Sequence, residues 1–544
     1  MESQPSEEKP PQAPENGIEK DTSDGRQQDQ AEDTGPELPF SIYSPREKKF
    51  IVLMASLAAL LSPLSANIYY PALNILADEL SVSSTLINLT ITAYLVGVID
   101  GDSRISYIVL TTMQIFQGIA PTFIGSISDE AGRRPSYLIC FVIYLGANIG
   151  LALQNSYPAL FLLRCLQSSG SSGTVALANA VVADLVTSAE RGSYIGYASV
   201  GALVGPAFGP VIGGLLCQYL GWRSVFWFLT IYAGFLVVIF ATILPETCRK
   251  VVGNGSIPPQ KWNVSLLTYI NLRSQRKACS ADAQQMLAYK PRINPLNSVR
   301  ILFDKESGLI LLYSGIIFSG YYMVITGMPS LLQQHYGFNT LQIGLCYIPS
   351  GVGSLTAAFL IGRLQDWNFR RLAKKQGMVI DKRKQQDLSN FPIELSRLQV
   401  TLPLVAISGI VIIGFGWVME CNTSLAGPLI FLLISTFCLS GAFNGLSTLI
   451  VDLNRASAGT ATAAMNLARC LMGAGAVAAV IPLLEKIGIG WTSVVIAGTW
   501  AFFSPILFMV IKFGPKWRKE KRIREEKRKT KEVREQAMVS SGKK

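Results

Sequence analysis

Two ten-residue stretches of this chain share a pattern and decide how it is organised. Residues 125–134 read Gly-Ser-Ile-Ser-Asp-Glu-Ala-Gly-Arg-Arg, and residues 362–371 read Gly-Arg-Leu-Gln-Asp-Trp-Asn-Phe-Arg-Arg. In each stretch a glycine stands four residues before an aspartate and two arginines end the motif, directly after a long apolar segment. The repeat predicts two halves of similar architecture, each with this loop at the same place.

The composition predicts that both halves lie in a lipid bilayer. Of the 544 residues, 49% are hydrophobic and 15% are charged, whereas an average soluble domain carries about 25% charged residues. A helix needs about 20 apolar residues to cross a bilayer. We therefore expect an all-α membrane protein of twelve spans, near 49–70, 84–128, 135–153, 157–183, 192–218, 223–244, 308–332, 341–363, 400–419, 426–450, 457–482 and 491–512.

Basic residues set the expected orientation. The stretch 364–400 holds eight of them, whereas the loops 71–83 and 420–425 hold none. Because loops rich in Lys and Arg stay in the cytoplasm, we expect both termini there. The expected parts are an acidic disordered tail (1–44), an N-terminal six-helix half (45–245), a cytoplasmic central loop (246–307), a C-terminal six-helix half (308–513) and a basic cytoplasmic tail (514–544).

The two tails carry opposite charge. Residues 1–44 hold eleven acidic and three basic residues, and residues 512–544 hold fourteen basic and five acidic ones. A basic run of this kind also occurs in nucleic-acid-binding proteins. Beside a span it is more simply an anchor attracted to anionic lipid headgroups, so we expect a bilayer partner and no nucleic acid.

Residues that catalysis or metal binding would need are scarce. His335 is the only histidine, the nine cysteines include no CxxC pair, and no GxxxxGK[ST] phosphate-binding loop occurs. We therefore expect no metal, no cofactor and no enzymatic activity.

The loop at 125–134 resembles the GxLaDrxGrr loop of the major facilitator superfamily, and the resemblance extends over about residues 45–515. Residues 164–167 look like the RxxQG element of that superfamily, with Ser168 in place of its glycine. The resemblance implies a cytoplasmic gate that closes between the halves. The residues that we expect to act in this gate are Gly125, Asp129, Gly132, Arg133, Arg134, Asp184, Glu190, Arg191, Gly362 and Asp366.

The fifth predicted span carries the most specific string. Residues 201–214 read Gly-Ala-Leu-Val-Gly-Pro-Ala-Phe-Gly-Pro-Val-Ile-Gly-Gly. Glycines at every fourth position form one face that permits close helix packing, and the prolines bend the helix. The order also resembles the antiporter element of proton-coupled exporters, which adds a conformational role to Gly201, Gly205, Pro206, Gly209, Pro210 and Gly213.

Three shorter strings narrow the resemblance. Residues 67–73, 221–227 and 244–247 look like the fungal 12-span drug:proton antiporter family, especially its quinidine-resistance branch. That branch is similar to fungal organic-acid exporters, including citrate exporters. The resemblance alone leaves the substrate open between these classes.

Two arginines, Arg164 and Arg469, are predicted to lie well inside spans, where charged groups are costly and are functional candidates. Each arginine either binds substrate or locks helices through backbone carbonyls. Buried cations favour an anionic substrate, and neighbouring aromatic rings favour a flat drug. The expected substrate-binding residues are Asn67, Tyr70, Arg164, Gln167, Tyr321, Asn444, Asn466 and Arg469.

We therefore expect a monomeric plasma-membrane exporter of drug-like or toxic small molecules that works by alternating access, with protons as the coupling ion. A citrate-like organic-acid exporter is the first alternative, and a sensor of the same fold that transports nothing is the second. No carboxyl group is placed at an obvious mid-membrane position for proton transfer, so facilitated efflux stays open.

Residues 97–115 do not fit a span. Joining Leu95-Val96 to Phe116 gives a continuous apolar helix, and the intervening residues place Asp100, Asp102 and Arg104 at membrane depth. We interpret this insertion as a short intron translated in frame, with a genuine insertion as the alternative.

Overall fold

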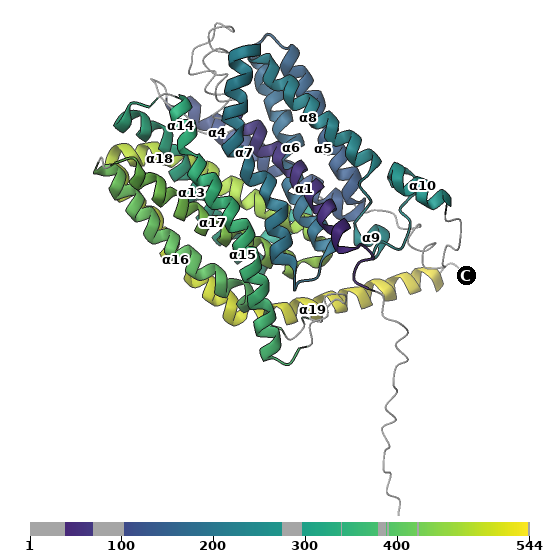
Figure 1. The fold of residues 1–544 in the computed structure, drawn as a ribbon. Coiled ribbons are helices and arrows are strands. Elements are labelled where there is room, and N and C mark those ends of the chain that lie inside the picture. The colour runs from purple at the N-terminus through teal and green to yellow at the C-terminus, as the bar shows by residue number, and fades with distance from the viewer. Residues whose placement is uncertain are drawn as a thin grey trace, which may run out of the picture. The chain divides into compact units, whose positions relative to one another are not determined.

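The computed structural model describes residues 39–68, 103–274, 296–338, 340–378, 388, 391–421 and 424–541. These residues form helices and connecting loops, without a strand (Figure 1). The long helices are α1 (Pro45–Asn67), α4 (Ser103–Glu130), α5 (Arg133–Leu153), α6 (Tyr157–Leu185), α7 (Arg191–Leu220), α8 (Arg223–Thr242), α13 (Lys305–Tyr336), α15 (Ile348–Lys375), α16 (Ile393–Glu420), α17 (Ala426–Leu453), α18 (Ala458–Phe503) and α19 (Pro505–Ser541). The short ones are α9 (Arg249–Val252), η2 (Lys261–Asn263), α10 (Leu266–Ser274), α12 (Leu296–Leu302), α14 (Thr340–Cys346) and η3 (Arg455–Ser457).

The start of α1 shows how the sequence sets a helix boundary. The Glu47 amide donates to the Ser44 side chain over 3.3 Å, and the Ser44 amide donates to the Glu47 carboxylate over 2.7 Å. This capping box satisfies two amides that the first turn leaves without helical partners. Pro45 follows at the first helical position, where its missing N–H costs nothing.

Most predicted spans correspond to a long helix. Eight helices in the described residues are long and apolar enough to cross a membrane, or nine if the bent α7 is counted as one span. The predicted spans 457–482 and 491–512 are joined in α18, which breaks at Gly488, where φ is 76°. The predicted second span is described only from Ser103, so twelve spans remain a prediction.

Each half has its own apolar core. One core is built from residues between Ile51 and Leu244, joined by Val451 and Ala458. A second is built from residues between Ile310 and Val510, joined by Ala189. Val451 and Ala458 lie at helix ends, and Ala189 lies in the loop between α6 and α7. Each half is therefore packed on its own, as the repeated motif predicts.

The helices of the two halves pair in the same way. In the N-terminal half α1 contacts α7, α4 contacts α6, and α5 contacts α8. In the C-terminal half α13 contacts α18, α15 contacts α17, and α16 contacts both α17 and α18. Two further pairs, α4 with α18 and α7 with α15, join the halves. The arrangement is that of the two-half membrane fold expected from the sequence.

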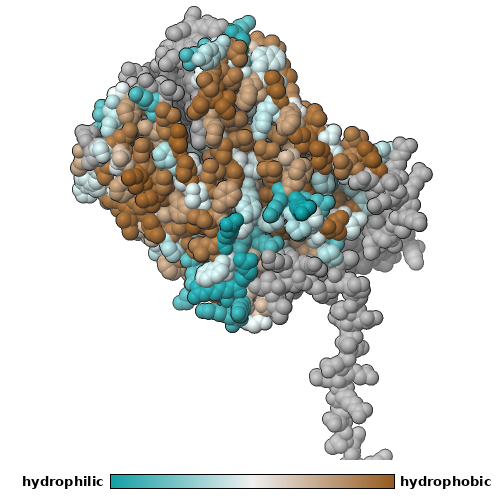
Figure 2. All heavy atoms as spheres, viewed as in Figure 1, coloured by the Kyte–Doolittle hydropathy of each residue, from teal (hydrophilic) through white to brown (hydrophobic). Residues whose placement is uncertain are grey.

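The outer surface of the bundle is largely apolar. Large side chains such as Ile231, Val238 and Ile410 are more than 60% exposed on the sides of α8 and α16, and Figure 2 shows hydrophobic residues over this face. Hydrophilic residues gather near the end of α15. Such a belt is what a bilayer covers. The chain is a multi-pass membrane protein.

Parts of the expected domain division lie outside the described residues, namely most of the acidic tail and the first part of the insertion at 97–115. Residues 103–115 of that insertion form the first half of α4. The expected boundary between the C-terminal half and the basic tail falls inside α19, which continues from Pro505 to Ser541 as one helix.

Candidate functional site: a gate between the halves and two buried arginines

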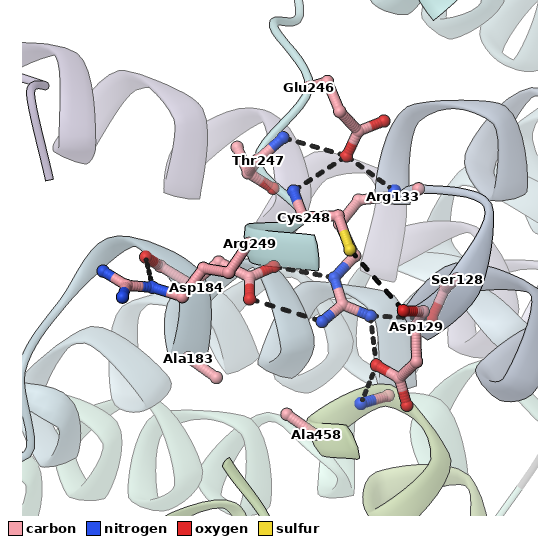
Figure 3. A network of polar contacts seen from close by, with 12 residues as sticks. Ser128, Asp129, Arg133, Ala183, Asp184, Glu246, Thr247, Cys248, Arg249 and Ala458 are labelled. Atoms are coloured by element: carbon pink, nitrogen blue, oxygen red, sulfur yellow. Dashed lines mark hydrogen bonds and ion pairs between the residues drawn. The ribbon is translucent and has the colours of Figure 1, made fainter. Parts of the chain in front are cut away.

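Arg133 lies between two carboxylates at one end of the bundle, which we call the gate end. Its Nε donates to Asp184 over 2.7 Å, and its Nη1 donates to Asp129 over 2.5 Å (Figure 3). All three side chains are buried. Burial raises the pKa of Asp184 above its ordinary value of 3.8, and Arg133 opposes that effect. One guanidinium therefore pairs with two carboxylates, one from α4 and one from α6.

Asp129 also caps a helix of the other half. Its carboxylate accepts hydrogen bonds from the backbone amide of Gly459 at 3.0 Å and from the amide and hydroxyl of Thr460 at 2.7 and 2.6 Å. These groups form the first turn of α18, where free amides and the helix dipole favour an anion. The loop that is predicted to act as a gate thus contacts the other half through an aspartate that caps a helix.

The C-terminal half repeats this arrangement. The carboxylate of Asp366 accepts from the amides of Gly192 and Ser193, each at 2.9 Å, in the first turn of α7. Arg397 pairs with Asp452 at 3.0 Å and lies 3.7 Å from Asp366. Each half therefore supplies one aspartate that caps a helix of the other half, with an arginine and a second aspartate behind it.

Further polar contacts join the halves around Asp452. Its Oδ1 accepts from Arg191 of α7 and, at 2.7 Å, from the Ser188 hydroxyl. Arg455, whose pKa burial lowers to about 10, donates to the same hydroxyl over 2.9 Å. A buried ion pair loses most of its hydration. The contact between the halves around Asp452 is therefore made by charged and polar groups.

Glycines let the gate helices touch. A Cβ on Gly125 would lie 2.7 Å from the Gly459 carbonyl oxygen, and one on Gly362 would lie 2.8 Å from the Gly192 carbonyl oxygen. Both distances are shorter than real Cβ contacts allow. The glycine that opens each repeated motif is therefore at a contact between the halves, which explains its place in the pattern.

Glu246 is a gate residue to which sequence reasoning assigned no role. Its Oε1 accepts from the amides of Arg133, Thr247 and Cys248, at 2.8, 2.9 and 2.9 Å. Its Oε2 accepts from Asn263 at 2.7 Å. The carboxylate thus caps α5 and ties it to the chain that follows α8.

Two neighbouring residues support this tie. Gly132 has φ of 122°, a conformation that favours glycine, and a Cβ there would collide with Glu246. Arg134 donates to the carbonyls of Phe240 and Ala241 at 3.1 and 2.9 Å. Arg134 therefore holds α5 to α8, whereas Arg133 pairs with acids of α4 and α6 in the same half. Glu190, the remaining predicted gate residue, directly precedes α7.

The glycine face of the fifth span packs against α1. A Cβ on Gly205 would lie 2.8 Å from the Leu64 amide nitrogen, and one on Gly209 would lie 2.8 Å from the Asn67 Cβ. At Gly201 and Gly213 a Cβ would overlap the carbonyls of Ser56 and Ile68. Close packing is thus a role of this face. α7 bends by 43° between the segments that end at Pro206 and begin at Val211, where Pro210 also lies.

Arg164 is part of a polar network inside the N-terminal half. Its Nη1 donates to the Gln167 side chain over 2.6 Å and to the Ser65 carbonyl over 3.4 Å. Gln167 in turn donates to Asn148 over 2.6 Å. Arg164 and Gln167 are fully buried. The network links α1, α5 and α6, which matches the helix-locking alternative for this arginine.

Arg469 has different surroundings. Its guanidinium carbon lies 5.3 Å from the ring centre of Phe318 on α13 and 5.7 Å from that of Phe443 on α17. Its buried Nε has no hydrogen-bond acceptor among the described residues. The Arg469 guanidinium is therefore held by aromatic rings and keeps an Nε–H group that can donate to an acceptor on a bound substrate.

Four of the other predicted binding residues come from α1, α13, α17 and α18. Asn67 donates to the Pro63 carbonyl over 2.6 Å, and Asn466 donates to the Gln117 carbonyl over 3.0 Å. Asn444 is buried on α17, and its Nδ2 lacks an acceptor in the described part of the chain. Tyr321 is half-buried on α13, and Tyr70 lies outside the described residues.

A comparison with protein families identifies the class of this chain. The model of the Major Facilitator Superfamily matches residues 55–477. The chain belongs to the major facilitator superfamily. Its two-half fold and its repeated gate motif agree with that membership, and the chain is a membrane transporter of this class.

Curated relatives of this transporter come from fungi. The MFS-type transporter phiD of Fungal sp. (strain ATCC 74256) is 44% identical over 485 residues, which cover 89% of this chain and 71% of the relative. The MFS-type transporter clz19 of Cochliobolus lunatus is 43% identical over 479 residues, covering 88% and 87%. Citrate exporter 1 of Aspergillus niger is 34% identical over 499 residues, covering 89% and 90%.

Solved structures share the fold of this transporter at low identity. The human organic anion transporter MFSD10 (TETRAN) superposes with a TM-score of 0.57 at 18% identity, over 86% of this chain and all of that one. The proton:xylose symporter XylE superposes with a TM-score of 0.58 at 15% identity, over 86% and 96%.

Proposed function

We propose that this transporter is a secondary-active exporter of the plasma membrane that works by alternating access, with both termini in the cytoplasm. The observation that carries this proposal is the contrast between packing within and between the halves. Each half has a separate apolar core. At the gate end, however, the halves meet through carboxylate caps and ion pairs, which water can replace when the halves separate.

The first candidate substrate is a drug-like or toxic small molecule, exported in exchange for protons. The glycine- and proline-rich face of α7 supports this reading through its likeness to the antiporter element. Aromatic side chains next to Arg469 also favour a flat, partly apolar molecule, because such rings stack on planar groups. The buried acids of the gate are the groups available for proton exchange, and Asp184 is one of them.

An organic acid is the second candidate, and Arg469 favours it. A guanidinium with an unused donor pairs naturally with a carboxylate, because the two planar groups match in geometry. The relative named a citrate exporter supports the same class. Arg164 contributes less to this argument, since its guanidinium already donates to Gln167.

The test is efflux from cells that express the form without residues 97–115, with citrate-like acids and cationic drugs measured side by side. Export of either class above the empty-vector level supports the proposal. Equal retention of every compound, from a protein that reaches the plasma membrane, contradicts it and favours the sensor alternative.

Two variants then separate the substrate classes. Arg469→Ala is expected to abolish export of an acid and to spare export of a cation, and Arg469→Lys, which keeps the charge, is expected to retain part of the acid export. Citrate movement that Arg469→Ala leaves unchanged would remove the organic-acid reading. Transport in proteoliposomes that ignores an imposed pH gradient would exclude proton antiport.

A further inference from the structure

Five large apolar side chains are exposed in the segment that joins the two halves. They lie in η2 and at the start of α10, in a stretch of nine residues. Their exposed fractions are 61% for Trp262, 55% for Leu266, 53% for Leu267, 56% for Tyr269 and 58% for Ile270. A segment surrounded only by water would rarely show such a cluster.

The polar residues of the same segment face the other way. Ser265 is buried, and its hydroxyl is hydrogen-bonded to the Thr268 hydroxyl at 2.7 Å, at the start of α10. Asn263 is 1% exposed. Asn263 and Ser265 are therefore turned toward the protein, whereas the five large apolar side chains of the segment are turned away from it.

The place of α10 in the fold indicates what covers those apolar side chains. α10 contacts α8, and Figure 1 shows it beside the gate end of that helix, at the edge of the bundle. α8 itself exposes Phe235 and Val238 by 57% and 61%, on the surface that lipid covers. The apolar face of α10 is thus continuous with an apolar surface already assigned to the bilayer.

We propose that residues 261–270 form an interfacial anchor in the bilayer leaflet at the gate end. Short amphipathic segments of this kind lie in the plane of the membrane, about 5–10 Å into the boundary between headgroups and acyl chains. Trp and Tyr favour that boundary because their rings are apolar and their N–H or O–H groups reach water. Trp262 and Tyr269 supply such rings, and the three aliphatic side chains enter the acyl region.

The anchor is next to the gate. Asn263, which follows Trp262, donates to Glu246, and Glu246 accepts from the backbone amide of Arg133. Two hydrogen bonds, both to Glu246, therefore connect the residue after Trp262 with the loop that carries Arg133. The anchor fixes the depth of that loop relative to the bilayer, independently of which molecule is transported.

The experiment places a bimane label at Leu267→Cys in the full chain, after replacement of Cys279 and Cys421 by serine, in lipid nanodiscs. The matched control carries the label at Lys374→Cys, an exposed residue near the gate end of α15. We expect lipids with a spin label near the headgroup to quench the label at position 267 and aqueous iodide to quench it little. The label at position 374 should show the reverse.

Either of two results would overturn the proposal. One is strong iodide quenching at position 267 without lipid quenching, which would place the segment in water. The other is protection from both quenchers, which would mean that protein covers the apolar face. A label-free measurement tests the same point: Trp262→Phe should reduce the total quenching by brominated lipids, although other exposed tryptophans such as Trp227 and Trp491 keep part of it.

Discussion

The helix cap made by Asp129 gives the sharpest prediction for the gate. In Asp129→Ala the gate end loses three hydrogen bonds between the halves, from the Gly459 amide and from the amide and hydroxyl of Thr460. Arg133 keeps Asp184 as a partner at 2.7 Å. The substitution therefore weakens contacts between the halves more than it weakens the N-terminal half itself.

The magnitude follows from the kind of bond that is lost. A hydrogen bond to a charged group contributes about 1.5–3 kcal/mol, and bonds that share one acceptor do not add fully. We take a net loss of about 3 kcal/mol, which shifts the equilibrium between closed and open gate about 100-fold toward the open form. Asp129→Asn keeps the shape and loses the charge, so we expect a shift of about 1.5 kcal/mol, or roughly tenfold.

The assay is the rate at which a maleimide modifies Thr462→Cys in nanodiscs, in a background without Cys279 and Cys421. Thr462 is 2% exposed, and its hydroxyl donates to the Ala176 carbonyl of the other half over 3.2 Å. Modification therefore requires an open gate. The rate should rise in the order unmodified chain, Asp129→Asn, Asp129→Ala, until opening itself no longer limits it.

The control is a helix cap of the same type that lies within one half. Glu420 accepts from the amides of Ile489 and Gly490 at 3.0 and 3.2 Å, and all three residues belong to the C-terminal half. Glu420→Gln should leave the modification rate unchanged. The reasoning fails if Glu420→Gln raises the rate as much as Asp129→Asn, or if Asp129→Ala leaves it unaltered.

Four further predictions test other parts of the structure. Glu246→Ala should lower the melting temperature, because it removes about 2 kcal/mol of charged helix capping. Glu130→Gln, which affects the partly exposed pair with Lys250, should change the melting temperature little. Equal effects of the two substitutions would contradict the role given to Glu246. Gly201→Ala should destabilise the protein, because a Cβ at this position overlaps the Ser56 carbonyl. Gly234 in α8 has open space around it, so Gly234→Ala should be neutral or slightly stabilising. A neutral Gly201→Ala would disprove the packing of α7 on α1. Burial raises the pKa of Asp184 in the closed gate, and opening the gate hydrates that carboxylate, so closing the gate binds protons. Lowering the pH toward 3.8 should therefore slow the modification of Thr462→Cys relative to that of Lys374→Cys. Asp184→Asn should remove this pH dependence. Finally, the mature transcript should lack the codons for residues 97–115, and their presence in it would show that the intron interpretation is wrong.

The contact between the halves at the gate end could be anticipated from the sequence, because two of its residues recur in a local pattern. Asp129 and Asp366 occupy the same position in the two repeated stretches, and the structure gives both the same task, each capping a helix of the other half. A glycine four residues earlier accompanies each aspartate for a reason that is also local, since the helices touch there.

Other gate contacts could not be anticipated, because they join residues without a shared motif. Arg397 lies 55 positions before Asp452, and nothing in the intervening sequence marks the pair. Its counterpart, Arg133, offered a signal, because both arginines stand near the start of the third span of their half. Glu246 belongs to the string 244–247, which resembles the fungal drug:proton antiporter family, but its role depends on the turn after α8 that brings its carboxylate to the start of α5.

The two arginines inside the spans show the limit of sequence reasoning most clearly. Both were expected from charge in an apolar segment, and the same rule applies to each. The structure separates them by their neighbours: Arg164 donates to Gln167 and to the Ser65 carbonyl within one half, whereas Arg469 lies against the rings of Phe318 and Phe443. Side-chain partners from other helices decide that difference, and no spacing within one helix encodes them.

Rocking of the two halves about a central site is the claim on which the proposed function rests, and spin-label distances at both ends of the bundle test it directly. One pair, Lys49→Cys and Lys374→Cys, spans the halves at the gate end, and a second, Leu153→Cys with the native Cys421, spans them at the opposite end; all four positions are exposed. On going from the unmodified gate to Asp129→Ala, the first distance should lengthen while the second shortens. Lengthening at both ends, or no change at either, would contradict alternating access in this protein.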